Sequence, residues 1–172
     1  HSMGGAIVQR LMATSMHHLA AAVLVSSPPP QGIDQTSLLG LFFKSPRNLL
    51  RSMRASRAHS GVRLASLFDT YLLNEYMSKE EVNHIRGQLC IESVAVYDDL
   101  MKPLIDDHIE IQIPVYVVGS KMDKVILLRD IQQQEIRYQT TAYLLEKSSH
   151  FLMLDPYKNE FVDILVEILS NR

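Results

Sequence analysis

Three residues of this chain carry the side chains that nucleophilic catalysis needs, and they occur in the order serine, aspartate, histidine. Ser2 lies in the opening segment HSMGG, which fills four of the five places of the G-x-S-x-G nucleophile elbow. Asp123 closes the segment GSKMD and His150 closes SSH, each just after an apolar run. In such a set the histidine removes the serine proton, and the aspartate fixes the imidazole tautomer. The order and placement predict a Ser2–Asp123–His150 triad.

Each of these residues alone also fits a structural role. A Ser-Gly start can be a tag scar, an aspartate often forms turns, and a histidine can be structural. The elbow interpretation requires an exposed serine at a strained strand-to-helix turn. Gly4 and Gly5 suit it by allowing close backbone approach, and apolar residues between 7 and 16 recur at helical spacing. The elbow's first glycine and strand would precede residue 1, so we expect the chain to begin in the middle of an enzyme.

The elements that must position these residues are predicted from apolar runs. Residues 20–27 (AAAVLVSS), 113–119 (IPVYVVG) and 141–147 (TAYLLEK) are short and apolar, as expected for strands covered on both faces. Residues 128–138 and 161–169 have helical patterns. The alternation of strands and helices predicts an α/β fold with a parallel sheet. The 27 residues from Asp123 to His150 leave room for one helix and one strand.

The middle of the chain differs, because it contains no convincing strand. Helices are predicted at residues 38–43, 48–57, 62–73, 79–89 and 92–102, and Ser78 with Glu81 forms a capping-box pattern. Such a block between parallel strands is most simply a cap over the strand ends, although it also fits an ordinary helical layer. We predict three parts: residues 1–30 with the elbow, helix and core strand, 31–107 as a helical cap, and 108–172 as the C-terminal core.

Composition excludes several classes of protein. The net charge of −2 gives no basic surface for nucleic acid, and no apolar run reaches the roughly 18 residues that span a bilayer. The single cysteine, Cys90, rules out an internal disulfide, so we expect a cytoplasmic protein. Acidic pairs such as Asp98–Asp99 lack the partners of a metal site. We expect neither a metal nor a cofactor.

Four segments together resemble the C-terminal portion of an α/β-hydrolase-fold enzyme: HSMGG, AAVLVSSPPPQG, IPVYVVGSKMD and KSSHFLMLDPYKNEFVDILVEIL. SSPPPQG is similar to esterase and lysophospholipase-like members with a helical cap. The resemblance spans nearly the whole chain and is weakest between residues 31 and 91. Two departures stand out. A serine replaces the glycine usual before the histidine, and the strands before the elbow are absent. Those strands carry one oxyanion-hole donor, which leaves the backbone amide of Met3 from this chain.

This resemblance implies a serine hydrolase that acts on a small-molecule carboxylic ester or related acyl compound. Two alternatives stay open. Relatives use the same triad for carbon–carbon bond hydrolysis, perhydrolysis or cyanohydrin cleavage. The chain could also be a truncated, catalytically silent fragment, or a half that needs a separate N-terminal half of the same fold.

Overall fold

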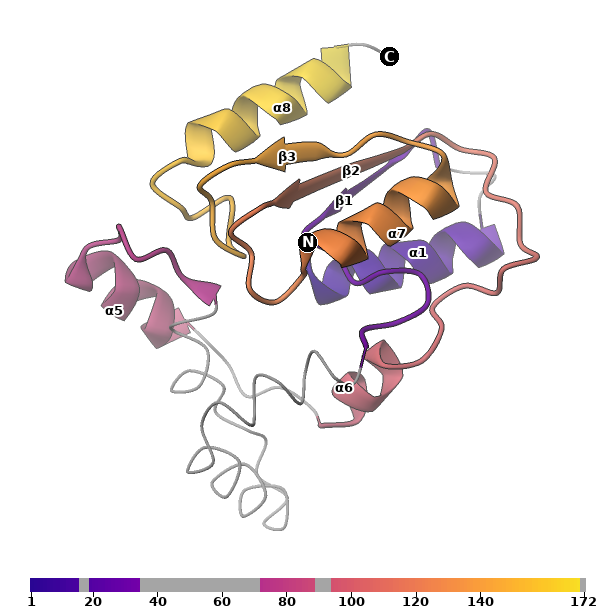
Figure 1. Ribbon diagram of the computed structural model, residues 1–172, viewed down its shortest axis with the longest axis horizontal. Helices are drawn as coiled ribbons and strands as arrows, with labels where there is room; N and C mark the ends of the chain where they lie inside the picture. The colour runs from indigo at the N-terminus through magenta and orange to yellow at the C-terminus, as the bar shows by residue number, and fades with distance from the viewer. Residues whose placement is uncertain (16–18, 35–71, 89–93, 171–172) are drawn as a thin grey trace.

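The computed structural model describes residues 1–15, 19–34, 72–88 and 94–170 (Figure 1). Helices and strands alternate at both ends of the chain, as the apolar runs predict. In chain order, the elements are α1 (Met3–Ser15), β1 (Ala22–Val25), α5 (Lys79–Gln88), α6 (Val94–Leu100), β2 (Val115–Ser120), α7 (Leu128–Tyr138), β3 (Tyr143–Leu145) and α8 (Lys158–Ser170).

The strands of the described residues form one parallel sheet in the order β1-β2-β3. Leu24 pairs with Val117 across β1 and β2, and Val118 pairs with Tyr143 across β2 and β3. Parallel neighbours need a crossover connection, and α7 supplies it between β2 and β3. The predicted α/β class with a parallel sheet is confirmed. Because the strands run in one direction, the loops after all three lie at the same end, beside the N-terminus (Figure 1).

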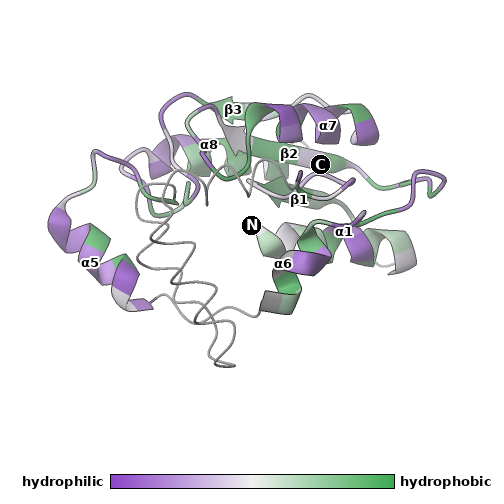
Figure 2. Cartoon of the chain, turned by 60° about the horizontal axis from the view of Figure 1, so that its bottom comes forward, coloured by the Kyte–Doolittle hydropathy of each residue, from purple (hydrophilic) through white to green (hydrophobic). Residues whose placement is uncertain are grey.

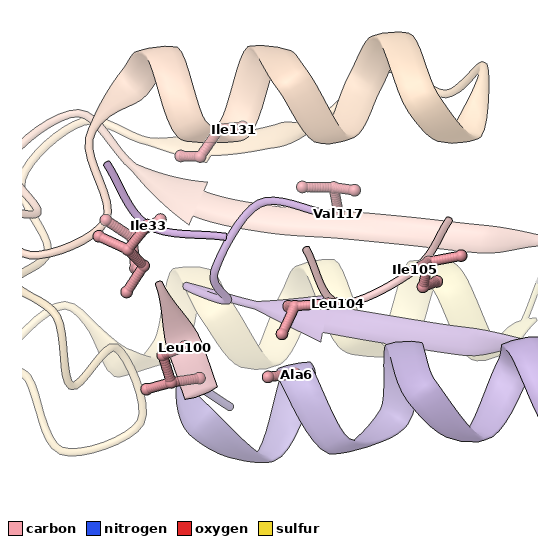
Figure 3. Packing of buried hydrophobic residues seen from close by; sticks show 8 residues of the cluster. Ala6, Ile33, Leu100, Leu104, Ile105, Val117 and Ile131 are labelled. Carbon is pink, nitrogen blue, oxygen red and sulfur yellow. The ribbon is translucent and has the colours of Figure 1, made fainter. Parts of the chain in front are cut away.

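Helices cover both faces of this sheet. Ala6 of α1, Val117 of β2 and Ile131 of α7 belong to one buried cluster, so α1 and α7 lie on the same face (Figure 3). Val118, the next residue along β2, belongs to a cluster with Phe161 of α8 on the opposite face. Successive side chains of a strand point to opposite faces, and both faces are apolar here. This explains why the strand segments are mostly apolar, and the strands are largely green in Figure 2.

Two strands are shorter than the apolar runs that predicted them. β1 occupies Ala22–Val25 within the run 20–27, and β3 occupies Tyr143–Leu145 within 141–147. The cause at β1 is local, because Ser26 has φ of +39° and turns the chain out of the extended conformation. An apolar run indicates which residues are buried. The strand itself ends where the backbone leaves the extended conformation, so it can be shorter than the run. The predicted helix at residues 128–138 coincides with α7.

The described part of the proposed cap comprises α5, α6 and their flanking segments. α5 begins with the predicted capping box, in which Glu81 N donates to Ser78 Oγ (3.2 Å) and Ser78 N donates to Glu81 Oε2 (2.8 Å). The helices predicted at 38–43 and 48–57, and most of 62–73, lie outside the described residues. The cap and the three-part division therefore stay predictions. No helix of the described residues is long and apolar enough to span a bilayer.

Candidate active site

Ser2 occupies a turn at the C-terminal end of the sheet, directly before α1. Its φ is +50°, a left-handed conformation that residues other than glycine rarely adopt. Ser2 N donates to the carbonyl of Val25 at the end of β1 (3.0 Å), and Gly5 N donates to Ser2 O (2.8 Å). These bonds hold the strained backbone in place. This strained turn is the geometry that the elbow interpretation predicts, and Ser2 itself is half-buried.

Gly5 is required for a close approach, whereas Gly4 is not. A Cβ at Gly5 would lie 1.9 Å from Ser27 Oγ and 2.4 Å from Ser27 Cβ. Among the described residues, a Cβ at Gly4 would meet no heavy atom within 4 Å. The expectation that both glycines serve close packing is therefore wrong for Gly4. Gly5 lets α1 pack against the loop after β1, and this contact sets the position of Ser2.

Asp123 lies in the loop after β2 and is 5% exposed. Its Oδ1 accepts hydrogen bonds from Val125 N (2.8 Å) and Ile126 N (3.0 Å). Its Oδ2 lies 2.9 Å from Nδ1 of His150, which is 2% exposed. The backbone bonds orient the carboxylate, so that its second oxygen points at the imidazole.

His150 connects the two other residues. Its Nε2 lies 2.9 Å from Ser2 Oγ, and its Nδ1 lies 2.9 Å from Asp123 Oδ2. A carboxylate only accepts hydrogen bonds, so Nδ1 carries the proton. Nε2 of the neutral ring is then an acceptor facing the serine hydroxyl. The structure thus brings together all three residues singled out in the sequence, with the imidazole able to take a proton from Ser2.

Two aromatic rings enclose this imidazole. The ring centroids of His1 and Phe151 lie 4.9 Å and 5.7 Å from that of His150. Nε2 of His1 donates to the His150 carbonyl oxygen (2.9 Å). The sequence pattern does not reveal this contact, because it joins residues from opposite ends of the chain. It fixes the histidine backbone against the elbow.

The loops after β2 and β3 are also tied to each other. Ser120 Oγ donates to Ser148 O (2.5 Å) and accepts from Met122 N (3.1 Å). Lys121 N donates to Leu145 O (2.9 Å). Ser120 itself is fully buried. Sequence reasoning missed Ser120, and its only signal was a hydroxyl at the end of an apolar run. Its two bonds keep the aspartate loop and the histidine loop in register.

A second buried carboxylate lies close to the site. Asp130 is 2% exposed, and its Oδ2 accepts a hydrogen bond from Leu127 N (2.8 Å) at the start of α7. Burial raises the pKa of the Asp130 carboxyl, and the nearby charge of Asp123 adds to the rise. Asp130 thus supports α7, while Asp123 alone faces the imidazole.

The remaining predicted group of the active site is the backbone amide of Met3, which is expected to be an oxyanion-hole donor. Met3 is the first residue of α1, and the first amides of a helix have no intrahelical acceptor. This amide follows Ser2 directly, as the elbow requires of an oxyanion donor. Among the described residues, no group of three or more His, Cys, Asp or Glu side chains could hold a metal ion.

A cavity of about 380 Å³ lies beside the histidine loop. Residues on one side of it come from the segment before α5, including Leu73 and Tyr76, and the other side includes Ser149 and Tyr157. Ser149 adjoins His150, but Ser2, Asp123 and His150 do not line this cavity. It is therefore a space between the segment before α5 and the histidine loop, apart from Ser2, Asp123 and His150.

Known proteins are similar to this chain both in family profile and in solved structure. A profile of the alpha/beta hydrolase family matches residues 1–163. No curated protein matches the chain. Among solved structures, the chain is similar to a thermophilic esterase, with 20% identity and a TM-score of 0.65 over 99% of this chain and 64% of that one. A putative non-heme bromoperoxidase from Mycobacterium tuberculosis gives 16% identity and a TM-score of 0.69 over 99% and 65%.

A meta-cleavage product hydrolase from Pseudomonas fluorescens is also similar, with 12% identity and a TM-score of 0.68 over 99% of this chain and 63% of that one. At these identities the likeness establishes the fold. The chain spans less than two thirds of the length of each of these three proteins.

Proposed function

This chain belongs to the alpha/beta hydrolase family, and we propose that it carries the catalytic residues of a serine hydrolase that cleaves carboxylic esters or related acyl bonds. The observation that carries the proposal is the continuous chain of contacts from Ser2 Oγ through the His150 imidazole to Asp123, with both distances 2.9 Å. Both distances lie in the range expected of a nucleophile, its base and the group that orients the base.

In the proposed reaction, Ser2 Oγ attacks the acyl carbonyl while Nε2 of His150 takes the serine proton. The resulting imidazolium lies against the buried carboxylate of Asp123, which stabilises its charge. Return of the proton to the leaving alcohol gives an acyl-enzyme. His150 then activates water, which releases the acid and restores Ser2.

The negative oxygen of the tetrahedral intermediate needs hydrogen-bond donors. We assign one donor to the Met3 amide, because it follows the nucleophile at the N-terminus of α1, where the helix dipole also favours negative charge. Losing a single such donor typically costs about 10²–10³ in rate. The second donor is not assigned to a described residue.

The same residues also support other reactions. The similar structures named above include an esterase, a bromoperoxidase and a meta-cleavage product hydrolase, which implies that this fold serves several chemistries. Carbon–carbon bond hydrolysis or perhydrolysis by Ser2 would use the same serine, histidine and aspartate. Product analysis with an ester and with a meta-cleavage product as substrates separates these reactions.

We also propose that the chain acts as one part of the enzyme, and that a further strand pairs with β1. On one side β1 pairs with β2, and no described strand pairs with its other edge. The carbonyl oxygen of Val25 on β1 accepts a hydrogen bond from the Ser2 amide and not from the amide of a neighbouring strand. An unpaired apolar edge is an aggregation hazard. We therefore expect this chain alone to aggregate and to lack measurable hydrolase activity.

The test compares this chain alone with the same chain co-expressed with an N-terminal half of the same fold. Turnover of p-nitrophenyl esters should appear only in the co-expressed sample, and Ser2→Ala should abolish it. Turnover that survives Ser2→Ala would refute the assignment of the nucleophile. A monomeric, cooperatively melting chain of 172 residues that turns over the ester alone would refute the need for a further strand.

A further inference from the structure

A third buried carboxylate, that of Asp155, is hydrogen-bonded to the loop that carries His150. Asp155 lies between β3 and α8 and is 1% exposed. Its Oδ2 accepts hydrogen bonds from Ser149 N (2.8 Å) and from Asn74 Nδ2 (3.0 Å), and its Oδ1 accepts one from Tyr157 N (3.0 Å). Hydrogen bonds to an ionised acceptor are stronger than neutral ones. The amide that Asp155 holds belongs to the residue directly before His150.

Asn74 links Asp155 to the start of the loop that carries His150. Its Nδ2 group donates both to Asp155 Oδ2 and to Lys147 O (2.7 Å), so it bridges the two ends of the loop that carries His150. Its Oδ1 accepts a hydrogen bond from Tyr76 N (3.0 Å), which fixes the segment before α5. Asn74 is 9% exposed and lies 81 positions before Asp155.

The same two segments meet in further contacts. The rings of Tyr76 and Tyr157 pack edge to face with centroids 6.3 Å apart, and Lys147 Nζ lies 5.7 Å from the Tyr157 ring centroid. Figure 1 shows the segment before α5 beside the loop between β3 and α8. The segment before α5, which lies within the predicted cap, is thus joined to the histidine loop by hydrogen bonds and by aromatic contacts.

We propose that Asp155 and Asn74 are positioning residues that couple the segment before α5 to the imidazole of His150. The inference rests on the proposed function for its effect on rate. Asp155 holds the Ser149 amide, Asn74 holds Asp155 and Lys147 O, and the backbone between these points carries His150. A displacement of residues 72–77 therefore moves the imidazole relative to Ser2 Oγ, although neither positioning residue touches the serine.

The test uses Asp155→Asn and Asn74→Ala in this chain co-expressed with an N-terminal half of the same fold, with Asp163→Asn on α8 and Asn83→Ala on α5 as exposed control variants. In Asp155→Asn, an NH₂ group must face one of the amide donors now bound to Asp155. Both positioning variants should lower kcat for a p-nitrophenyl ester by about 10–100-fold, with a smaller change in KM, because small misplacements of catalytic groups cost this much. The controls should stay within about twofold of wild type, in line with the small effects of exposed substitutions.

Two further readouts separate positioning from a merely structural role. At a temperature where circular dichroism shows every variant folded, the low-field proton resonance of His150 Nδ1–H should shift or broaden in both variants and stay unchanged in the controls. The double variant should lose no more than the worse single variant, because residues that act as a unit are not additive.

Unchanged kcat and an unchanged resonance in folded Asn74→Ala would overturn the inference, even if Asp155→Asn fails to fold. Losses that multiply in the double variant would also overturn it, because they would mean independent roles. The His150 Nδ1–H resonance can be measured in a protein that has no activity. If it shifts in both variants of a protein that has no esterase turnover, the positioning role stands and the proposed function fails.

Discussion

Replacing Asp123 by asparagine tests the proton arrangement at the site. The side chain keeps its shape, but one carboxylate oxygen becomes an NH₂ group. Val125 N and Ile126 N both donate to Oδ1, at 2.8 Å and 3.0 Å, so the amide oxygen must take that position. The NH₂ group then faces Nδ1 of His150, where Oδ2 now lies at 2.9 Å.

This orientation reverses the imidazole tautomer. Nδ1 must accept a hydrogen bond from the asparagine, so the proton moves to Nε2, which then donates to Ser2 Oγ instead of accepting from it. The ring can no longer remove the serine proton. We expect kcat to fall on the order of 10⁴-fold, or about 5 kcal/mol of transition-state stabilisation. Both backbone hydrogen bonds to residue 123 survive, so the melting temperature should stay within a few degrees of wild type.

The assay compares kcat and thermal melting for Asp123→Asn, wild type and Asp99→Asn, each co-expressed with an N-terminal half of the same fold; Asp99 is an exposed aspartate and serves as the control. The control should match wild type in both measurements. A folded Asp123→Asn protein that keeps more than about a tenth of the wild-type kcat would refute the tautomer argument. Equal loss of activity and of folded protein would assign Asp123 a structural role instead.

Two further predictions concern stability. Gly5→Ala should destabilise the fold by about 1–3 kcal/mol in denaturant unfolding, because the new Cβ overlaps Ser27, whereas Gly4→Ala should be neutral or stabilising; equal effects would contradict the packing argument. Burial raises the pKa of Asp130, so its contribution to stability is full below the unfolded pKa and is lost as pH rises through the folded pKa. Asp130→Asn should therefore gain stability relative to wild type as the pH rises above about 4, the ordinary pKa of an aspartate, and a pH-independent difference would contradict this.

The parts of the site that could be predicted are those set by local sequence. Ser2, Asp123 and His150 each follow the end of a strand or open a helix, and in a parallel sheet these ends lie together. The capping box of Ser78 and Glu81 spans three residues, so its pattern is visible in the chain. The bounds of α7 follow from helical periodicity.

The parts that could not be predicted depend on long-range polar contacts. Asn74 and Asp155 are 81 positions apart, and nothing in either local segment indicates that they pair. The ring of His1 packs on His150 across nearly the whole chain. Ser120 resembles any hydroxyl at the end of a strand. Periodicity reports which residues are buried, but the partner of a buried polar group is fixed only by the tertiary fold.

The most direct test of the central claim is to map the site of covalent modification by a fluorophosphonate, which reacts with an activated serine. The probe should be applied to this chain together with an N-terminal half of the same fold, with the Ser2→Ala and His150→Ala variants as controls. Mass spectrometry of the digested protein should place a single phosphonate adduct on Ser2, and both variants should lose it. An adduct on another residue, or labelling that survives Ser2→Ala, would contradict the assignment of Ser2 as the nucleophile.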